Sequence, residues 1–359
     1  MTGWNPIFMS NMPRHTVSQA RSFKENPRHY PRKFQVGVYN TFSKRLPYHP
    51  LPSKPQRILI QAQEKIGDAI LLFPIISGLK KQFPSSIIHL LCSTKNKHIF
   101  ESHKDVKKIM VYRSGYSFWQ SLKETHYDLF YNPKDHPSIT GINIAKKVRA
   151  DVKVCIADRR QEQYYNYGIT VNQSNHILEK NGAILRAYDF GFKLEPTIPN
   201  VSLTDPKEKN HISINLSAGS NTRKWPLNNW ISLIDFIIKE NEEIVINLFS
   251  FGKEVKQGQK LKDRYNSFIK LCQIDSILDA GPIIQKSSLL ISPDTAMVHI
   301  ADAVGTPIVG LYSGDDRNVA RYRPYWMKHR ILQSPSLSIQ NIEPSEVFHA
   351  LKELMKVNA

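Results

Sequence analysis

Cysteine is scarce in this 359-residue sequence: Cys92, Cys155 and Cys272 are odd in number and far apart. This spacing fits neither a disulfide framework nor a zinc site, and it predicts reduced thiols. The N-terminus lacks the apolar core of a secretory signal, and no uncharged apolar run reaches the roughly 18 residues of a membrane span. The longest candidate, residues 69–79, contains Pro74. We therefore expect a cytoplasmic protein that contacts a membrane only peripherally.

Acidic residues are few relative to basic ones: 31 Asp and Glu against 49 Lys and Arg give a formal charge of +18. The imbalance is strongest in residues 1–60, where ten Lys and Arg stand against one acid, Glu25. Such a surface favours nucleic acid, acidic lipid headgroups or phosphorylated substrates, although a solvated basic tail without a partner fits the same pattern. No RRM, KH, zinc-finger or basic-zipper signature is present, so we expect no nucleic acid partner.

The length suits two domains of about 150 residues each, and a hydrophobic content of 41% is sufficient for packed cores. Residues 1–55 are rich in Pro, Arg, His and Tyr without periodicity, which predicts an extension wrapped on the surface or partly disordered. Short apolar runs then alternate with segments of helical spacing. In this first half we expect strands at 57–61, 87–92, 108–112, 129–131 and 152–156, and helices at 68–83 and 176–190.

The alternation stops in the Pro-rich segment 195–209, which looks like a linker, and restarts at residue 211. The second half is predicted to contain strands at 211–216, 243–250, 289–292 and 307–312, and helices at 226–240, 295–304 and 343–355. This pattern predicts an α/β fold with two doubly wound halves, each a parallel sheet covered by helices. A ligand cleft is then expected between the carboxyl ends of the two sets of strands.

The segment from Ile291 to Tyr312 predicts a strand, a tight turn, a helix and a second strand. Asp294 and Thr295 lie where the helix begins, and its unpaired N–H groups together with the helix dipole form a site for phosphate. Asp294 is itself an anion, so it is better placed to bind sugar hydroxyls than phosphate. His299 lies on the same helix face as Thr295. From spacing alone, the alternative is that Asp294 is an ordinary N-cap and that His299 is a semi-buried histidine whose hydrogen bonds are satisfied within the protein.

This segment resembles the signature of glycosyltransferase family 9, the heptosyltransferase family: Asp-Thr/Ser-Gly, two residues, His, one residue, Ala-Ala, then Gly-Thr-Pro and a strand. The matching positions are Asp294, Thr295, His299, Ala301, Ala303, Gly305, Thr306 and Pro307. The sequence departs from the signature at Ala296, where the family usually has Gly. A backbone N–H survives this change, but the added methyl group is expected to hinder the close approach of a phosphate.

Residues 57–84 look like the family's opening strand, Gly-Asp turn and helix ending in Phe-Pro. The family's catalytic base is the Asp of this turn, which implies Asp68 here. A carboxylate in the cleft can take the proton of an attacking hydroxyl, and the helix dipole is expected to keep it ionised. A capping Asp without chemistry is the alternative. Glu64 and Lys65 are unusual before this turn, so we expect local substrate contacts to differ.

Residues 214–230 look like the family's strand, small-residue loop and Lys-Trp-Pro motif. In the family, the loop hydroxyls and the Lys hold the phosphates of the donor, which implies Ser220 and Lys224 here. A solvated Lys at a helix start is the alternative, but its charge would oppose the helix dipole. Glu254 follows a later strand and is a candidate for a ribose contact, although a surface Glu is the simpler interpretation.

The resemblance covers about residues 56–355 and implies a GT-B fold, in which two Rossmann-like domains face each other across a cleft. Residues 1–55 form a basic N-terminal extension outside the resemblance. The implied divisions are an acceptor domain at 56–195, a linker at 196–210, a nucleotide-sugar domain at 211–340 and a closing helix at 341–359 that packs back toward the acceptor domain.

The resemblance also implies a function: inverting transfer of heptose from ADP-heptose to the inner core of lipopolysaccharide, at the inner face of the inner membrane. Transfer of another sugar to outer core or capsule is an alternative, and so is an inactive nucleotide-sugar-binding homologue, which Ala296 suggests. No cofactor is implied. The sequence contains no Asp-x-Asp motif and no visible cluster of metal ligands, so we expect catalysis without a metal.

Overall fold

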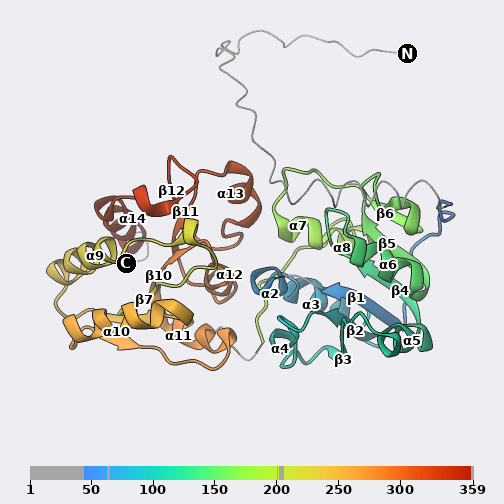
Figure 1. Ribbon diagram of the computed structural model, residues 1–359, viewed down its shortest axis with the longest axis horizontal. Helices are drawn as coiled ribbons and strands as arrows, with labels where there is room; N and C mark the ends of the chain where they lie inside the picture. Colours follow the sequence, from blue (N-terminus) through green and yellow to red (C-terminus); the bar gives the residue numbers. More distant parts are fainter. Residues whose placement is uncertain (1–43, 63–64, 200, 202–205, 357–359) are drawn as a thin grey trace, which may run out of the picture.

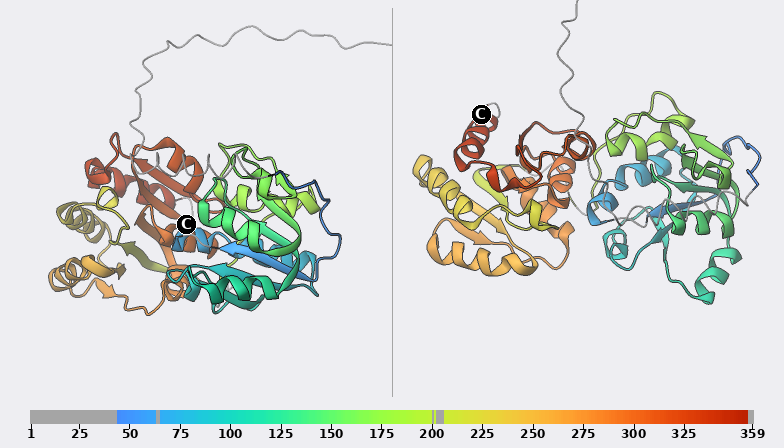
Figure 2. Two further views of the ribbon diagram at one scale, coloured as in Figure 1. Left: turned by 45° about the vertical axis from the view of Figure 1, so that its right-hand side comes forward. Right: turned by 45° about the horizontal axis from the view of Figure 1, so that its top comes forward.

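Two parallel six-stranded sheets lie side by side in the computed structural model, which describes residues 44–62, 65–199, 201 and 206–356 (Figure 1, Figure 2). The strand order is β3-β2-β1-β4-β5-β6 in one sheet and β9-β8-β7-β10-β11-β12 in the other. Each order places the first strand of its sheet beside the second and the fourth, which is the doubly wound topology of nucleotide-binding domains. The prediction of two α/β halves is therefore confirmed.

The first domain, as we use the term, is the first sheet with helices α2 to α8. Apolar runs form its strands because both faces of a parallel sheet are covered. Its strands are β1 (Arg57–Ala62), β2 (Ile87–Cys92), β3 (Val106–Val111), β4 (His126–Asn132), β5 (Arg149–Ile156) and β6 (Tyr167–Ile169). Its helices are α2 (Ile66–Ile70), α3 (Phe73–Gln82), α4 (Lys97–Phe100), α5 (Tyr116–Glu124), α6 (Ile139–Lys147), α7 (Ile177–Asn181) and α8 (Ala183–Tyr188).

Two helices that the sequence predicts as continuous are each divided in two. The helix expected at 68–83 is separate helices α2 and α3, because Pro74 has no N–H with which to continue the hydrogen bonds of α2. The helix expected at 176–190 is divided at Gly182 into α7 and α8. No helix or strand is found among the described residues between α8 and β7, and the predicted domain boundaries there stay a prediction.

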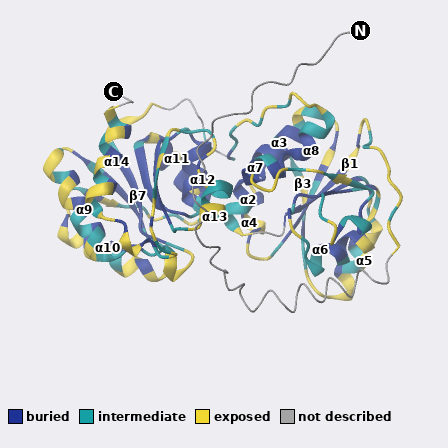
Figure 3. Cartoon of the chain, turned by 90° about the horizontal axis from the view of Figure 1, so that it is seen from above, coloured by how far each residue is buried: buried dark blue, intermediate teal, exposed yellow. Residues whose placement is uncertain are grey.

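The second domain is the second sheet with helices α9 to α14. Its strands are β7 (Glu208–Asn215), β8 (Val245–Phe249), β9 (Ile269–Leu271), β10 (Ser287–Pro293), β11 (Ile308–Tyr312) and β12 (His329–Gln333). Its helices are α9 (Leu227–Glu240), α10 (Val255–Arg264), α11 (Ala280–Lys286), α12 (Ala296–Ala303), α13 (Asp316–Tyr322) and α14 (Pro344–Lys356). Strands β8, β10 and β11 are largely buried, the edge strands β9 and β12 are partly exposed, and α9, α10 and α14 each present an exposed face (Figure 3).

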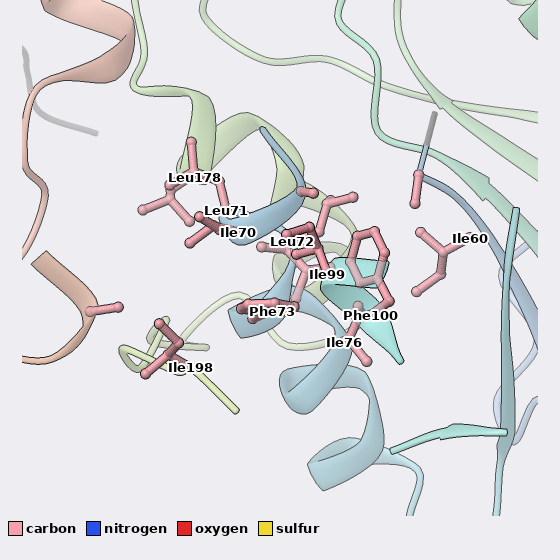
Figure 4. Packing of buried hydrophobic residues seen from close by; sticks show 14 of the residues in the cluster. Ile60, Ile70, Leu71, Leu72, Phe73, Ile76, Ile99, Phe100, Leu178 and Ile198 are labelled. Atoms are coloured by element: carbon pink, nitrogen blue, oxygen red, sulfur yellow. The ribbon is translucent and has the colours of Figure 1, made fainter. Parts of the chain in front are cut away.

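One apolar cluster continues from the first domain into the second. It joins the turn between α2 and α3 to α4 and α7, and Figure 4 shows Leu72 and Phe73 of that turn near Phe100, with Leu71 near Leu178. The same cluster includes Met297 of α12, which contacts α2 across the domain boundary. Burial of this shared apolar surface stabilises the contact between the two domains.

Helix α14 packs on the second domain. Its buried residues Val347, Leu351 and Leu354 belong to the same cluster as Trp230 and Leu233 of α9. The expectation that residues 341–359 pack back toward the first domain is therefore wrong for the described part of this segment. The apolar face of α14 is satisfied by its own domain, and contacts with the first domain are made by α12, by α13 and by the residues that follow α13.

The last residues of the predicted extension lie along the edge of the first domain. The backbone N–H of Leu46 donates to Gln163 O at 3.0 Å, and the Asn166 side chain donates to Pro47 O at 3.1 Å. The rings of Tyr48 and Tyr167 are 5.7 Å apart. Residues 1–43, which carry most of the predicted extension, lie outside the described residues.

Truncation of Leu351 to Ala should lower the free energy of unfolding by about 2–4 kcal/mol, because it leaves a cavity between α14 and α9. Urea unfolding followed by circular dichroism measures the loss, and Lys356→Ala at the exposed end of the same helix is the matched control. Equal stability of Leu351→Ala and the control would contradict the packing of α14 on this core.

Candidate active site

A cleft of about 700 Å³ lies where the carboxyl ends of the two sheets face each other. In the first domain it begins directly after β1, and in the second domain after β7 and β10. Strand order reverses at these points, so the connections leave to opposite sides of each sheet and a crevice opens between them. Of the residues predicted for the site, the cleft is lined by Asp68, Ser220, Lys224, Glu254, Asp294, Thr295, Ala296 and His299.

Asp68 is the acidic residue that the first domain contributes to the cleft. It lies in the first turn of α2, directly after Gly67. Burial raises the pKa of Asp68, while the charge of Lys65 and a hydrogen bond from the Tyr322 hydroxyl act in the opposite direction. Burial is thus the largest effect on this pKa, and the expectation that the dipole at the start of α2 keeps the carboxyl ionised stays a prediction. A carboxylate with a raised pKa is well suited to accept a proton near neutral pH.

The loop after β7 brings Lys224 to the opposite wall. Trp225 is buried, donates its Nε1–H to Ile342 O at 2.9 Å and packs edge-on against Trp230, which fixes the residue after Lys224. Lys224 Nζ lies 2.6 Å from Glu254 Oε1. Glu254 is buried, so the interpretation of a surface Glu is wrong. Ser220 is exposed in the same loop, and its hydroxyl lies 3.0 Å from that of Thr222.

Asp294 directly follows β10, and its buried carboxylate has two partners, both at Oδ2. It accepts a hydrogen bond from Asn318 Nδ2 at 2.6 Å and pairs with Arg223 Nη2 at 3.2 Å. Burial raises the pKa of Asp294, and the charge of Arg223 and the Asn318 hydrogen bond oppose this shift. Its neighbours come from the loop after β7 and from helix α13, and they fix the direction of the carboxylate in the cleft.

The start of α12 forms the floor of the cleft. Thr295 is the N-cap, but its hydroxyl lies 3.2 Å from both Asn215 Nδ2 and Ser292 Oγ and does not cap the first-turn amides. Ala296 follows as the first helical residue. His299 is buried one turn later, and no partner for its Nδ1 lies among the described residues. The amides of the first turn are therefore free of side-chain caps and able to bind an anion.

Residues 115–343 match the sequence profile of glycosyltransferase family 9 (heptosyltransferase). The chain belongs to this family. Lipopolysaccharide heptosyltransferase 3 of Escherichia coli is 22% identical over 282 residues, covering 70% of this chain and 81% of that protein. The lipopolysaccharide core heptosyltransferase OpsX of Haemophilus influenzae is 21% identical over 300 residues, covering 76% and 82%. This family 9 chain is thus a glycosyltransferase of the heptosyltransferase type.

The fold of the family 9 chain is GT-B. The E. coli heptosyltransferase WaaC with ADP superimposes with a TM-score of 0.68 at 15% identity, over 83% of this chain and 99% of that one. The same enzyme with ADP-2-deoxy-2-fluoro heptose gives 0.68 at 16% identity, over 84% and 100%. Within the described residues, no helix has the length and apolar character that crossing a membrane requires.

Sequence reasoning missed the residues that reach the family 9 cleft from α13. Asn318 and Tyr322 line it, and Arg321 beside Tyr322 pairs with Asp135 of the first domain. The only sequence signal for this contact was an unassigned basic and aromatic stretch at residues 316–326. Because Asp135 and Arg321 are 186 residues apart, neither local spacing nor motif order could pair them.

One group of potential metal ligands exists among the described residues: His126, Asp128 and Asp151 lie within 4.8 Å of one another. It lies at the amino ends of β4 and β5, on the side of the sheet away from the cleft. Asp128 already accepts the backbone N–H groups of Gln56 and Arg57 at 2.6 and 2.7 Å. The expectation of catalysis without a metal stays a prediction.

His299 should stay neutral through the physiological pH range. Burial lowers its pKa to about 3, with smaller effects from His176 and Arg223. Its imidazole C–H resonances, assigned by their loss in His299→Gln, should therefore not shift between pH 5 and 8. A His299 midpoint near 6.5 would show that the imidazole is solvated.

Proposed function

We propose that the protein transfers heptose, with inversion, from ADP-heptose to the inner core of lipopolysaccharide. One observation carries the proposal: the carboxylate of Asp68 from the first domain faces a wall of the second domain that supplies Lys224 and the free amides of α12. This arrangement provides a base on one side of a reacting sugar and stabilisation of a leaving diphosphate on the other.

On the donor side, Lys224, Ser220 and the amides of Thr295 and Ala296 are proposed to hold the diphosphate. Lys suits this task as a point charge, and a helix start supplies N–H groups directed at the anion. WaaC, which has the same fold, has been solved with ADP and with ADP-2-deoxy-2-fluoro heptose, and this supports an ADP-heptose donor for the present chain. A cleft of about 700 Å³ is within the size range of small-molecule sites.

The remaining predicted residues are assigned to the sugars. Asp294, a buried carboxylate at the end of β10, is proposed to accept hydroxyls of the heptose, with His299 as a neutral neighbour. Glu254 is proposed to contact the ribose and also to orient Lys224, to which it is already paired.

In the proposed reaction, Asp68 removes the proton of an acceptor hydroxyl as its oxygen attacks the anomeric carbon. The bond from that carbon to the diphosphate breaks, and ADP leaves with the electron pair on the opposite face. Lys224 and the α12 amides stabilise the charge that develops on the leaving oxygen. No step requires a metal.

Ala296 supports two alternatives. Its methyl group at the first position of α12 narrows the space over the amides. A different donor sugar, transferred to outer core or capsule, would fit a reshaped site, and an inactive donor-binding homologue would lack turnover altogether. Mass spectrometry of core oligosaccharide from cells with and without the gene separates these outcomes, because each predicts a different mass change.

The acceptor places the enzyme at the inner face of the inner membrane. Lipopolysaccharide core is anionic and membrane-embedded, and a chain with a formal charge of +18 is attracted to such a surface. We propose a cytoplasmic protein with peripheral membrane contact, to which residues 1–55 contribute basic charge.

Replacing Asp68 by Asn should preserve folding and ADP binding but reduce turnover by about 10²–10⁴, because an amide cannot accept the hydroxyl proton. The assay measures ADP release from ADP-heptose with heptose-free core as acceptor. Asp263→Asn on exposed α10 is the matched control and should be fully active. Near-normal kcat in Asp68→Asn would remove Asp68 as the base.

Replacing Lys224 by Ala should weaken ADP binding by about 10- to 100-fold, because a charged hydrogen bond to the diphosphate is lost. Isothermal calorimetry with ADP measures the effect, and Lys256→Ala on the exposed face of α10 controls for net charge. Unchanged ADP affinity in Lys224→Ala would exclude this residue from the phosphate site.

A further inference from the structure

The residue that follows β10 is held from both of the strands that flank β10 in the sheet (Figure 1). This residue is Asp294, and its neighbours are Arg223, in the loop after β7, and Asn318, in the helix α13 that follows β11. All three side chains line the cleft. We call Arg223 and Asn318 the clamp. The clamp lies within the second domain, on the side of the cleft that the donor is proposed to occupy.

The clamp contacts one oxygen of the Asp294 carboxylate and leaves the other. Asn318 Nδ2 donates to Oδ2 at 2.6 Å, and Arg223 Nη2 lies 3.2 Å from the same atom. Arg223 Nη1 also donates to the carbonyl oxygen of Asp294 at 2.9 Å. Oδ1 has no partner among the described residues, and it is not one of their fully buried unpartnered atoms. Oδ1 is therefore open to the cleft.

The helix that carries Asn318 is fixed at both ends. Asn318 lies in the first turn of α13, where the N-cap Asp315 accepts the backbone N–H groups of Arg317 and Asn318 at 3.1 and 3.2 Å. The carbonyl oxygen of Tyr322, the last residue of α13, accepts the Tyr312 hydroxyl at 2.9 Å. These contacts place the Asn318 amide against the carboxylate before any ligand binds.

Both acceptor positions of Oδ2 are occupied by the clamp. A carboxylate has about four acceptor sites, two at each oxygen, and the clamp supplies two donors at Oδ2 of Asp294. Burial raises the pKa of Asp294, whereas the charges of Arg223 and Lys65 and the Asn318 hydrogen bond lower it; the charge of Asp315 adds to the rise. A hydroxyl of a donor sugar can therefore reach the carboxylate only at Oδ1.

We propose that Asn318 and Arg223 are positioning residues for the donor sugar: they occupy Oδ2 of Asp294 and thereby direct Oδ1 at a hydroxyl of the heptose. The proposal rests on the proposed sugar contact of Asp294, and it goes further by naming the residues that direct this contact. A sugar whose hydroxyl does not meet Oδ1 leaves a nearly buried carboxylate oxygen without a partner. The clamp thus contributes to discrimination among donor sugars.

The test measures binding of ADP and of ADP-heptose by isothermal calorimetry, in the wild-type protein and in Asn318→Leu. Leu has nearly the shape of Asn but no hydrogen-bond donor. The variant should bind ADP-heptose about tenfold more weakly, because Asp294 loses a charged hydrogen bond and can turn away from the sugar. ADP lacks the heptose, so its affinity should not change. The same substitution at exposed Asn266, in the turn after α10, is the matched control and should alter neither affinity.

A double-mutant cycle determines whether Asn318 acts through Asp294. Asp294→Ala removes the carboxylate, and adding Asn318→Leu should then cause no further loss of ADP-heptose affinity. Additive losses would show that Asn318 contacts the sugar itself, and they would overturn its positioning role. Should Asn318→Leu fail to fold, Arg223→Lys takes its place in the cycle, because Lys keeps the charge but cannot reach the carbonyl oxygen and Oδ2 together.

Unchanged ADP-heptose affinity in Asn318→Leu would overturn the proposal. Equal losses of ADP and ADP-heptose affinity would do the same, because they indicate general damage to the cleft. Neither measurement requires an acceptor or turnover. A wild-type protein that binds ADP-heptose but transfers nothing to heptose-free core would refute the proposed function, whereas the cycle would still report the coupling of Asn318 to Asp294. The two failures are thus distinguishable.

Discussion

The contact between helix α2 of the first domain and helix α12 of the second sets the width of the cleft. Gly67 lies so close to α12 that a Cβ atom there would be 3.4 Å from His299 Cδ2 and 3.8 Å from the Cα of Ala296. Asp68 is the next residue, so one turn of chain brings together the proposed base and the proposed anion-binding start of α12. Apolar residues of the cluster that continues between the domains surround this contact and exclude water from it.

Three cations at or beside the cleft have acidic partners within the protein. Lys224 is paired with Glu254, Arg223 with Asp294 and Arg321 with Asp135. Each pairing limits the cost of partly burying a charge and fixes the direction of a long side chain before a ligand arrives. Lys65 and Lys253 also line the cleft, and both are exposed.

The sequence alone predicted the two parallel sheets and the residues that line the cleft from each β-α turn, because these depend on local patterns. Asp68, Lys224 and Asp294 follow strands whose apolar runs are evident. Contacts between segments far apart in the sequence could not be predicted, as the Asp135–Arg321 and Arg223–Asp294 pairs illustrate. The orientation of α14 was wrong because an amphipathic helix does not reveal which of two cores its apolar face will cover.

Nearly all side chains of helix α12 are buried. Every residue from Met297 to Ala303 is buried, and they face different neighbours: the interdomain core, the cleft through His299, and the α13 segment through Asp302. Gly305 ends the element with φ of 79°, a conformation that few other residues adopt without strain. Directed evolution toward a new donor would therefore gain little room on this helix. Variation is better tolerated at Ser220, which is exposed and lines the same cleft.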